Sequence, residues 1–234
     1  MRNIWAIIVG VVVVAGAGVA LYNAVGDGDA PRPARVAATQ PTDQAADASA
    51  APTPSATFST VEITADDFVL GKDDAPVTLV EYASLTCPHC ARFHTNVLPT
   101  IKSEYIDKGL VRLVYRDFPL DNAALMAAVV AQCAGRERYF GFLDALFAAQ
   151  ENWARAGDPA AALQRIAALG GMSQAEFNAC LKNESIVDAV VKERLEADKK
   201  FGVNSTPTLL VNGEKYSGGL TAEQFRAVVA PKLN

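Results

Sequence analysis

The sequence has 234 residues, of which 50% are hydrophobic and 20% are charged, so the chain can bury a substantial core and is neither disordered nor fibrous as a whole. The formal net charge is −5 and no run of basic residues occurs, which argues against nucleic acid as a partner. Four cysteines are too few for a disulfide-dense scaffold, so each must be judged by its own position.

An uncharged apolar segment occupies residues 4–25 and is preceded by Arg2. It is long enough to cross a bilayer as a helix, and the basic residue before it favours export of the rest of the chain. The alternative is a cleaved secretory signal, because small residues that suit a cleavage site lie within the segment. Residues 26–57 are rich in Ala, Pro, Asp, Thr and Ser and show no apolar period, which predicts a flexible linker. A spacer of this kind favours the membrane anchor.

The globular pattern opens with a short strand or hairpin over 61–70. The next strand, over 77–85, has apolar residues on both faces, as expected for a strand buried within a sheet. An amphipathic helix is predicted from about residue 91 to residue 108, with a kink at Pro99. A further strand is predicted over 110–118.

The apolar period then becomes helical and stays so from about residue 120 to 201. We predict helices over 121–134, 137–149, 159–168, 173–183 and 185–200. A hairpin of strands at 208–211 and 215–217, turned at Asn212-Gly213, and a closing helix from Thr221 complete the chain. The order predicts one α/β domain over 58–234 with an all-helical insertion.

The tetrapeptide Cys87-Pro88-His89-Cys90 lies between the strand at 77–85 and the helix after it. A cysteine at a helix N-terminus meets unpaired N–H groups and the positive end of the helix dipole, which favour a thiolate. The thiolate is the nucleophile of disulfide exchange, so Cys87 is the candidate reactive thiol. Pro88 suits the first helical turn, and His89, if cationic, would stabilise the thiolate further. Removing His89 is therefore expected to raise the pKa of Cys87.

A C-x-x-C pair also occurs in zinc sites and in structural disulfides. A zinc site needs two further ligands, and the nearby candidates are His89 and His94 alone. We therefore predict neither a metal nor a cofactor, and we interpret the pair as redox-active. His94 is interpreted as a partly exposed helix residue.

Cys133 and Cys180 fall on the inward faces of two predicted helices. In an exported domain such cysteines are expected to form a structural disulfide. Two buried free thiols and a second redox relay are the alternatives.

Glu81 and the Thr206-Pro207 step are further candidate site residues. Glu81 lies six positions before Cys87 in an apolar strand, where burial of its carboxylate would suit a proton-accepting role; the alternative is a surface glutamate on an edge strand. Pro207 either begins the next strand or follows a cis peptide bond that would place the backbone of Thr206 beside the dithiol. The residues alone leave both pairs of alternatives open.

Taken together, these residues resemble the DsbA-type thiol:disulfide oxidoreductases of the thioredoxin superfamily. The resemblance covers about residues 58–234 and rests on Glu81, the C-P-H-C tetrapeptide, the helical insertion and Ser205-Thr206-Pro207-Thr208 before a hairpin. It implies a thioredoxin-like fold with an inserted helical domain, with Pro207 as the cis proline and Glu81 as the buried acid near the resolving thiol. It further implies that a substrate thiolate attacks Cys87, and that Cys90 is the buried partner.

The same resemblance implies export to the periplasm and the introduction of disulfides into reduced, unfolded or partly folded exported proteins. The apolar segment at residues 4–25 predicts a tether to the inner membrane, which is not general in the family. A DsbB-like membrane protein is implied as its reoxidation partner. Thr206 departs from the Val that dedicated oxidases often carry before the cis proline. An isomerase or reductase kept reduced by a membrane partner therefore stays an alternative, as does a non-enzymatic holdase or metal-carrying module.

Overall fold

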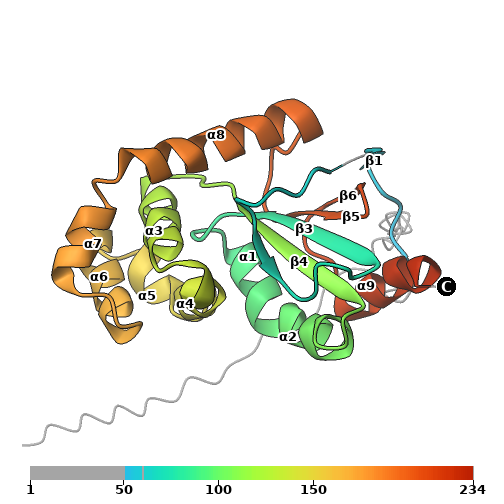
Figure 1. Cartoon of the computed structure of the whole chain (residues 1–234), viewed down its shortest axis with the longest axis horizontal. Helices are drawn as coiled ribbons and strands as arrows, with labels where there is room; N and C mark the ends of the chain where they lie inside the picture. The colour runs from blue at the N-terminus through green and yellow to red at the C-terminus, as the bar shows by residue number, and fades with distance from the viewer. Residues whose placement is uncertain (1–50, 60, 234) are drawn as a thin grey trace, which may run out of the picture. The chain divides into compact units, whose positions relative to one another are not determined.

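The structure, a computed structural model, describes residues 51–59 and 61–233. Six strands form one mixed sheet in the order β1-β6-β5-β3-β4-β2 (Figure 1). β3 and β4 are parallel, and every other neighbouring pair is antiparallel. The strands are β1 (Ala56–Thr57), β2 (Phe68–Leu70), β3 (Val77–Ala83), β4 (Val111–Asp117), β5 (Thr208–Val211) and β6 (Glu214–Ser217). The strands predicted over 77–85 and 110–118 are thus confirmed as β3 and β4.

Helices cover both faces of this sheet, which explains why β3 is apolar on both sides (Figure 1). On one face, Leu79 of β3 packs in a cluster with Phe93 and with Phe225 of α9 (Ala222–Val229). On the other face, Val80 packs with Ala197 of α8 (Glu184–Phe201). Burial of these side chains on both faces holds β3, and the loop after it, between two helical layers.

The chain after β3 is helical from Pro88 to Ile106, although it is not one regular helix. It consists of α1 (Pro88–Arg92), a π-helical turn at Phe93–Val97, α2 (Leu98–Ile101) and a second π-helical turn at Lys102–Ile106. Pro99 has no N–H to donate to the preceding turn, and the first π-helical turn ends just before it. The helix was predicted to begin near residue 91; it begins three residues earlier, so the dithiol lies in its first turn.

Six helices form the insertion between β4 and β5. They are α3 (Asn122–Cys133), α4 (Arg136–Ala148), α5 (Gln150–Ala154), α6 (Pro159–Leu169), α7 (Gln174–Cys180) and α8 (Glu184–Phe201). Five were predicted, and α5 was missed because it has five residues and too little length to show a period. Trp153 of α5 is nevertheless buried in the core of the insertion, with its indole N–H donating to the carbonyl of Leu146 at 2.7 Å.

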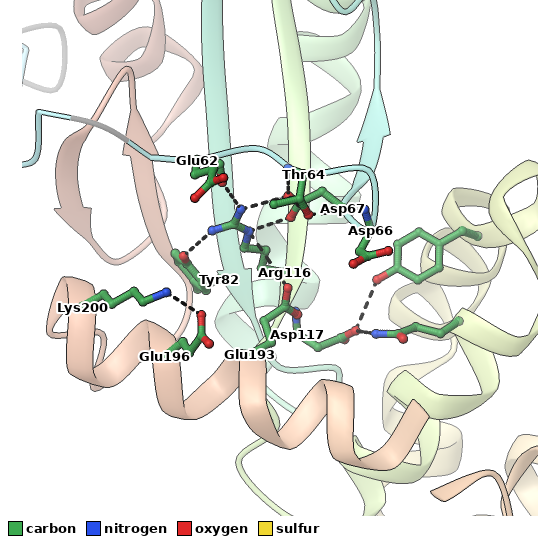
Figure 2. A network of polar contacts seen from close by, with 12 residues as sticks. Glu62, Thr64, Asp66, Asp67, Tyr82, Arg116, Asp117, Glu193, Glu196 and Lys200 are labelled. Atoms are coloured by element: carbon green, nitrogen blue, oxygen red, sulfur yellow. Dashed lines mark hydrogen bonds and ion pairs between the residues drawn. The ribbon is translucent and has the colours of Figure 1, made fainter. Parts of the chain in front are cut away.

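Polar contacts attach α8 to the sheet (Figure 2). Arg116 of β4 donates to Asp67 at 2.7 Å and to the hydroxyl of Tyr82 at 2.9 Å. Beside it, the backbone N–H of Asp117 donates to a carboxylate oxygen of Glu193 at 2.7 Å. The Asp117 carboxylate also accepts from the side chain of Gln132 in α3 at 2.8 Å, so β4, α3 and α8 meet at one buried cluster.

The hairpin of β5 and β6 turns at Asn212 and Gly213, which have φ angles of 46° and 86°. Positive φ at both positions suits the twist of a two-residue hairpin turn. The backbone of Phe58 passes so close to Gly213 that a side chain there would collide with it. Ala56 and Thr57 pair with Lys215 and Glu214 of β6, so the last two residues of the linker predicted over 26–57 belong to the sheet.

The apolar segment at residues 4–25, and the predicted linker up to residue 50, lie outside the described residues. Among the residues that are described, no helix has the length and apolar character needed to span a membrane. The anchor and its alternative, a cleaved signal, stay predictions.

Candidate active site

The loop from β3 to α1 brings the dithiol to the carboxyl end of β3. Cys87 is the N-cap of α1, with extended backbone angles of φ −79° and ψ 119°, and its N–H donates to the carbonyl of Ser84 at 3.0 Å. The hydroxyl of Thr86 donates to Asp121, the N-cap of α3, at 2.7 Å. These bonds fix the loop from both sides, so the position of Cys87 is set by β3 and by the start of the insertion.

Cys87 and Cys90 both have free thiols, and their environments differ. The pKa of Cys87 is lowered to about 5, mainly by a hydrogen bond from the Cys90 thiol, with further help from the Thr206 side chain and the backbone N–H groups of Cys90 and His89. Partial burial opposes this lowering. The carbonyl oxygen of Thr206 lies 3.3 Å from Sγ and accepts a hydrogen bond from the thiol form.

Cys90 has the opposite character. It is fully buried, and burial raises its pKa far above the ordinary range, with the hydrogen bond to Cys87 and the charge of Glu81 acting in the same direction. The dithiol is therefore asymmetric near neutral pH. Cys87 is a thiolate, and Cys90 is a neutral thiol.

The peptide bond between Thr206 and Pro207 is cis, which decides between the two alternatives that the sequence left open. The loop that carries it leads into β5, the neighbour of β3, and places the backbone of Thr206 against Sγ of Cys87. The Thr206 hydroxyl is buried and has no hydrogen-bond partner within the described residues. A substrate cysteine joined to Cys87 would meet this backbone, so the loop is suited to contact a bound chain.

His89 differs from the expectation of a cationic ring beside the thiolate. Its Nδ1 lies 2.7 Å from the guanidinium of Arg92. Because a guanidinium only donates hydrogen bonds, this nitrogen accepts and carries no proton. What His89 contributes directly to the lowered pKa of Cys87 is its backbone N–H, which any residue other than proline supplies. Pro88 and the His89 ring are exposed and form the rim of the site.

His94 is buried, so its interpretation as a partly exposed residue was wrong. Its Nε2 lies 2.9 Å from Oε2 of Glu81, and the two side chains are 2% and 0% exposed. Four residues after Cys90, His94 faces the same side of the helix, toward the sheet. Glu81 is buried as well, in the third strand of the chain, which rules out the surface position that the sequence left open. The only signal in the sequence for the burial of His94 was its position as a polar residue on the inward face of the helix.

Gln150 is a second residue that the sequence analysis missed. This first residue of α5 is buried, and its side-chain Nε2 donates to the carbonyl oxygens of Leu85 and Cys87 at 2.8 and 3.0 Å. It thus ties the insertion to the loop that carries the dithiol. Glutamine is common on helix surfaces, so nothing in its local sequence distinguished it.

The other two cysteines lie within the insertion and are bonded to each other. Cys133 at the end of α3 and Cys180 at the end of α7 form a disulfide, with their Cα atoms 6.0 Å apart. Within the described residues no group of three or more His, Cys, Asp or Glu side chains could hold a metal ion.

The chain is similar to a known protein family, to sequences of known proteins and to solved structures. The thioredoxin family model matches residues 64–230. The crystal structure of Wolbachia pipientis alpha-DsbA1 has a TM-score of 0.70 and 35% identity, and the match covers 74% of this chain and 94% of that one. A putative protein-disulfide oxidoreductase of Rickettsia bellii is 33% identical over 162 residues, which are 68% of this chain and 62% of the relative. A probable disulfide bond formation protein D of Bacillus anthracis is 32% identical over 62% of this chain and 69% of its own length. The match thus spans less than two thirds of the Rickettsia protein.

Proposed function

Because the chain belongs to the DsbA-like branch of the thioredoxin family, we propose that it is a thiol:disulfide oxidoreductase that donates the Cys87–Cys90 disulfide to reduced protein substrates. The observation that carries this proposal is the asymmetry of the two thiols. Cys87 has a pKa of about 5 and is 6% exposed, next to the exposed Pro88, whereas Cys90 is 0% exposed and neutral. Thiol exchange at one reactive sulfur, with the second sulfur held behind it, is the chemistry that this arrangement supports.

The reaction proceeds in two exchanges. A substrate thiolate attacks Sγ of Cys87, the Cys87–Cys90 bond breaks, and its electron pair leaves on the sulfur of Cys90, which takes up a proton. A second substrate thiolate then attacks the substrate sulfur of the mixed disulfide, which forms the substrate disulfide and releases Cys87 as a thiolate. The substrate loses two electrons and the dithiol gains them.

The low pKa of Cys87 favours oxidation of the substrate as the net direction. A leaving thiol with a low pKa leaves faster, and a stabilised thiolate makes the reduced protein the favoured form, so the disulfide is readily given away. Leu120 supports a role with unfolded substrates, because its side chain is 50% exposed and its N–H bonds to the active-site loop at Ser84. Apolar surface attached to the active-site loop suits chains whose cores are not yet buried.

The second candidate is an isomerase or reductase, favoured by the residue type at Thr206 alone. Threonine before the cis proline resembles the reductases and isomerases of the superfamily, whereas dedicated oxidases often carry Val there. We place the protein on the periplasmic side of the inner membrane, tethered by residues 4–25, with a DsbB-like membrane protein as the oxidant of the reduced dithiol. These placements rest on the resemblance and on the apolar N-terminal segment.

The test uses the oxidised full chain and a reduced, denatured protein with several cysteines. Wild-type protein should form disulfides in the substrate in proportion to its own amount, and Cys87→Ala should form none. Cys90→Ala, which has no internal disulfide to donate, should likewise form none. If wild type and Cys87→Ala oxidise the substrate at equal rates, the proposed activity is wrong. The thiol state of the dithiol in the exporting cell then separates the two candidates, since an oxidase is held oxidised and a reductase reduced.

A further inference from the structure

Glu81 and His94 form a buried acid–base pair directly behind the active-site helix. Their Oε2 and Nε2 atoms are 2.9 Å apart, while Oε1 of Glu81 and Nδ1 of His94 are buried and have no hydrogen-bond partner within the described residues. The imidazole is stacked on the ring of Phe147 in α4, with centroids 4.1 Å apart and an interplanar angle of 24°. Its orientation toward Glu81 is therefore set by the insertion.

One proton must lie between the two facing atoms. A carboxylate oxygen and an unprotonated imidazole nitrogen both only accept, so a 2.9 Å contact between them requires a proton on one or the other. A neutral imidazole in the Nε2–H tautomer meets this requirement beside an ionised Glu81, and the pair then carries one negative charge. Uptake of one further proton leaves the pair with no net charge. A buried group that can hold or release a proton in this way is a proton store.

Cys90 is the group that must give its proton to a neighbour, or take one from it, during disulfide exchange. It is fully buried, and each exchange at the dithiol either deposits a negative charge on its sulfur or requires removal of its proton. Glu81 acts electrostatically on Cys90, and His94 lies one helical turn beyond it on the same face. Two other titratable groups face the pair. The ring of Tyr115 on β4 lies 5.7 Å from that of His94, and burial raises the pKa of Asp144 on α4, which the charge of His94 acts to lower.

We propose that His94 is a positioning residue that shares a proton with Glu81 and so allows this carboxyl group to exchange protons with Cys90. The inference rests on the proposed function and assigns to His94 a role in the step at the buried sulfur. When the dithiol is oxidised by a small disulfide, the Cys90 thiol gives its proton to the Glu81–His94 pair. The resulting thiolate attacks Sγ of Cys87, and the bound thiol leaves with the electron pair of the broken bond. In the opposite direction the pair returns a proton to Cys90.

The reaction with glutathione disulfide separates the step at Cys87 from the later step at Cys90. The reduced full chain is mixed with excess glutathione disulfide, quenched with acid at intervals, and analysed by mass. The first phase, formation of the glutathione adduct, requires only the Cys87 thiolate. The second phase, decay of the adduct to the internal disulfide, requires Cys90 to lose its proton. The first phase thus reports on the folded site, and the second on the proton store.

Three variants test the pair: His94→Gln, His94→Asn and Glu81→Gln. We expect each to form the adduct within about twofold of the wild-type rate, and to resolve it at least tenfold more slowly near neutral pH, because a positioned acid–base group contributes roughly 10²–10⁴-fold. The deficit should shrink as pH rises, since hydroxide then takes the Cys90 proton. The double variant Glu81→Gln/His94→Gln should be no slower than either single variant. Thr95→Ala, an exposed neighbour on the same helix, should match wild type.

Either of two results would overturn the role of His94. One is resolution at the wild-type rate in both His94 variants, and the other is equal slowing of both phases, which would mean that His94 is needed only for the structure around Cys87. If the wild-type chain itself forms neither adduct nor internal disulfide, the failure belongs to the proposed function instead.

Discussion

The side-chain nitrogen of Gln150 lies 3.0 Å from the carbonyl oxygen of Cys87, and this bond joins the first residue of α5 to the N-cap of α1. The insertion therefore also fixes the active-site loop, because the side chain of Gln150 donates hydrogen bonds to the carbonyl oxygens of Leu85 and Cys87. The same insertion provides Phe147, on which His94 is stacked.

Gln150→Met is expected to destabilise the protein. The variant keeps the side-chain length but leaves the buried carbonyl groups of Leu85 and Cys87 without their donor, which costs about 1–3 kcal/mol. The loop would also shift relative to the thiolate and alter its alkylation rate. Denaturant unfolding and iodoacetamide alkylation at fixed pH measure the two effects. Gln174→Met, an exposed glutamine of α7, is the control; equal losses in the two variants would contradict the role of Gln150.

The alkylation rate of Cys87 should rise through an inflection near pH 5 and stay level above it, because the thiol has a pKa of about 5. The sequence predicted that removal of the His89 ring would raise this inflection. His89→Ser is instead expected to leave it in place, because Nδ1 of His89 carries no proton and the backbone N–H of residue 89 is kept. A clear upward shift would contradict this and show that the imidazole stabilises the thiolate.

The buried carboxyl groups of Asp117 and Glu193 should make stability depend on pH. Burial raises the pKa of each, and their mutual repulsion adds to the effect at Glu193, even though part of that side chain stays exposed. Because the folded pKa values lie above the unfolded ones, this contribution to stability is complete below about pH 4 and is lost progressively as pH rises toward 8.

Glu193→Gln should therefore flatten the decline in unfolding free energy between about pH 4.5 and pH 8, since the pair then holds a single ionisable group. The amide oxygen still accepts the N–H of Asp117, so the contact between β4 and α8 is kept. Urea unfolding at several pH values provides the measurement. Glu196→Gln, on the exposed side of the same helix, should retain the wild-type slope, and an unchanged slope in Glu193→Gln as well would contradict the assignment.

Removing the disulfide between Cys133 and Cys180 should lower stability without removing activity. The bond joins residues 47 positions apart, for which the chain-entropy model gives roughly 4 kcal/mol. The double variant Cys133→Ala/Cys180→Ala is expected to unfold at lower denaturant concentration and to oxidise substrate at the wild-type rate while folded. A selective loss of oxidase activity in the folded variant would instead favour the second redox relay.

Much of the fold could be predicted because its signals are local. The apolar runs of β3 and β4 and the capping boxes at Ser173 and Thr221 mark elements that form as expected. The family resemblance and the thioredoxin-like fold with its helical insertion, both inferred from the sequence, are confirmed by the comparisons.

The rest of the site depends on contacts between distant segments. Glu81 and His94 are 13 residues apart, and Gln150 lies 63 residues after Cys87, so no periodicity brings them together. His94 was misjudged because a histidine near a helix edge is usually solvated, and its burial became evident only with Phe147 packed against it. The catalytic roles of Cys87, Cys90 and Pro207 remain predictions, and the proposed experiments address those of Cys87 and Cys90.

The pairing of β1 with β6 has a practical consequence for making the domain. The N–H of Ser55 donates to Lys215 and that of Phe58 to Gly213, so these few residues occupy the outer edge of a hairpin strand. An unoccupied edge of this kind is a template for pairing with another molecule. A shortened protein that starts where the composition turns globular, at residue 58, would lack β1 and present the bare edge of β6 to its neighbours in concentrated solution. A soluble version should start well before residue 55.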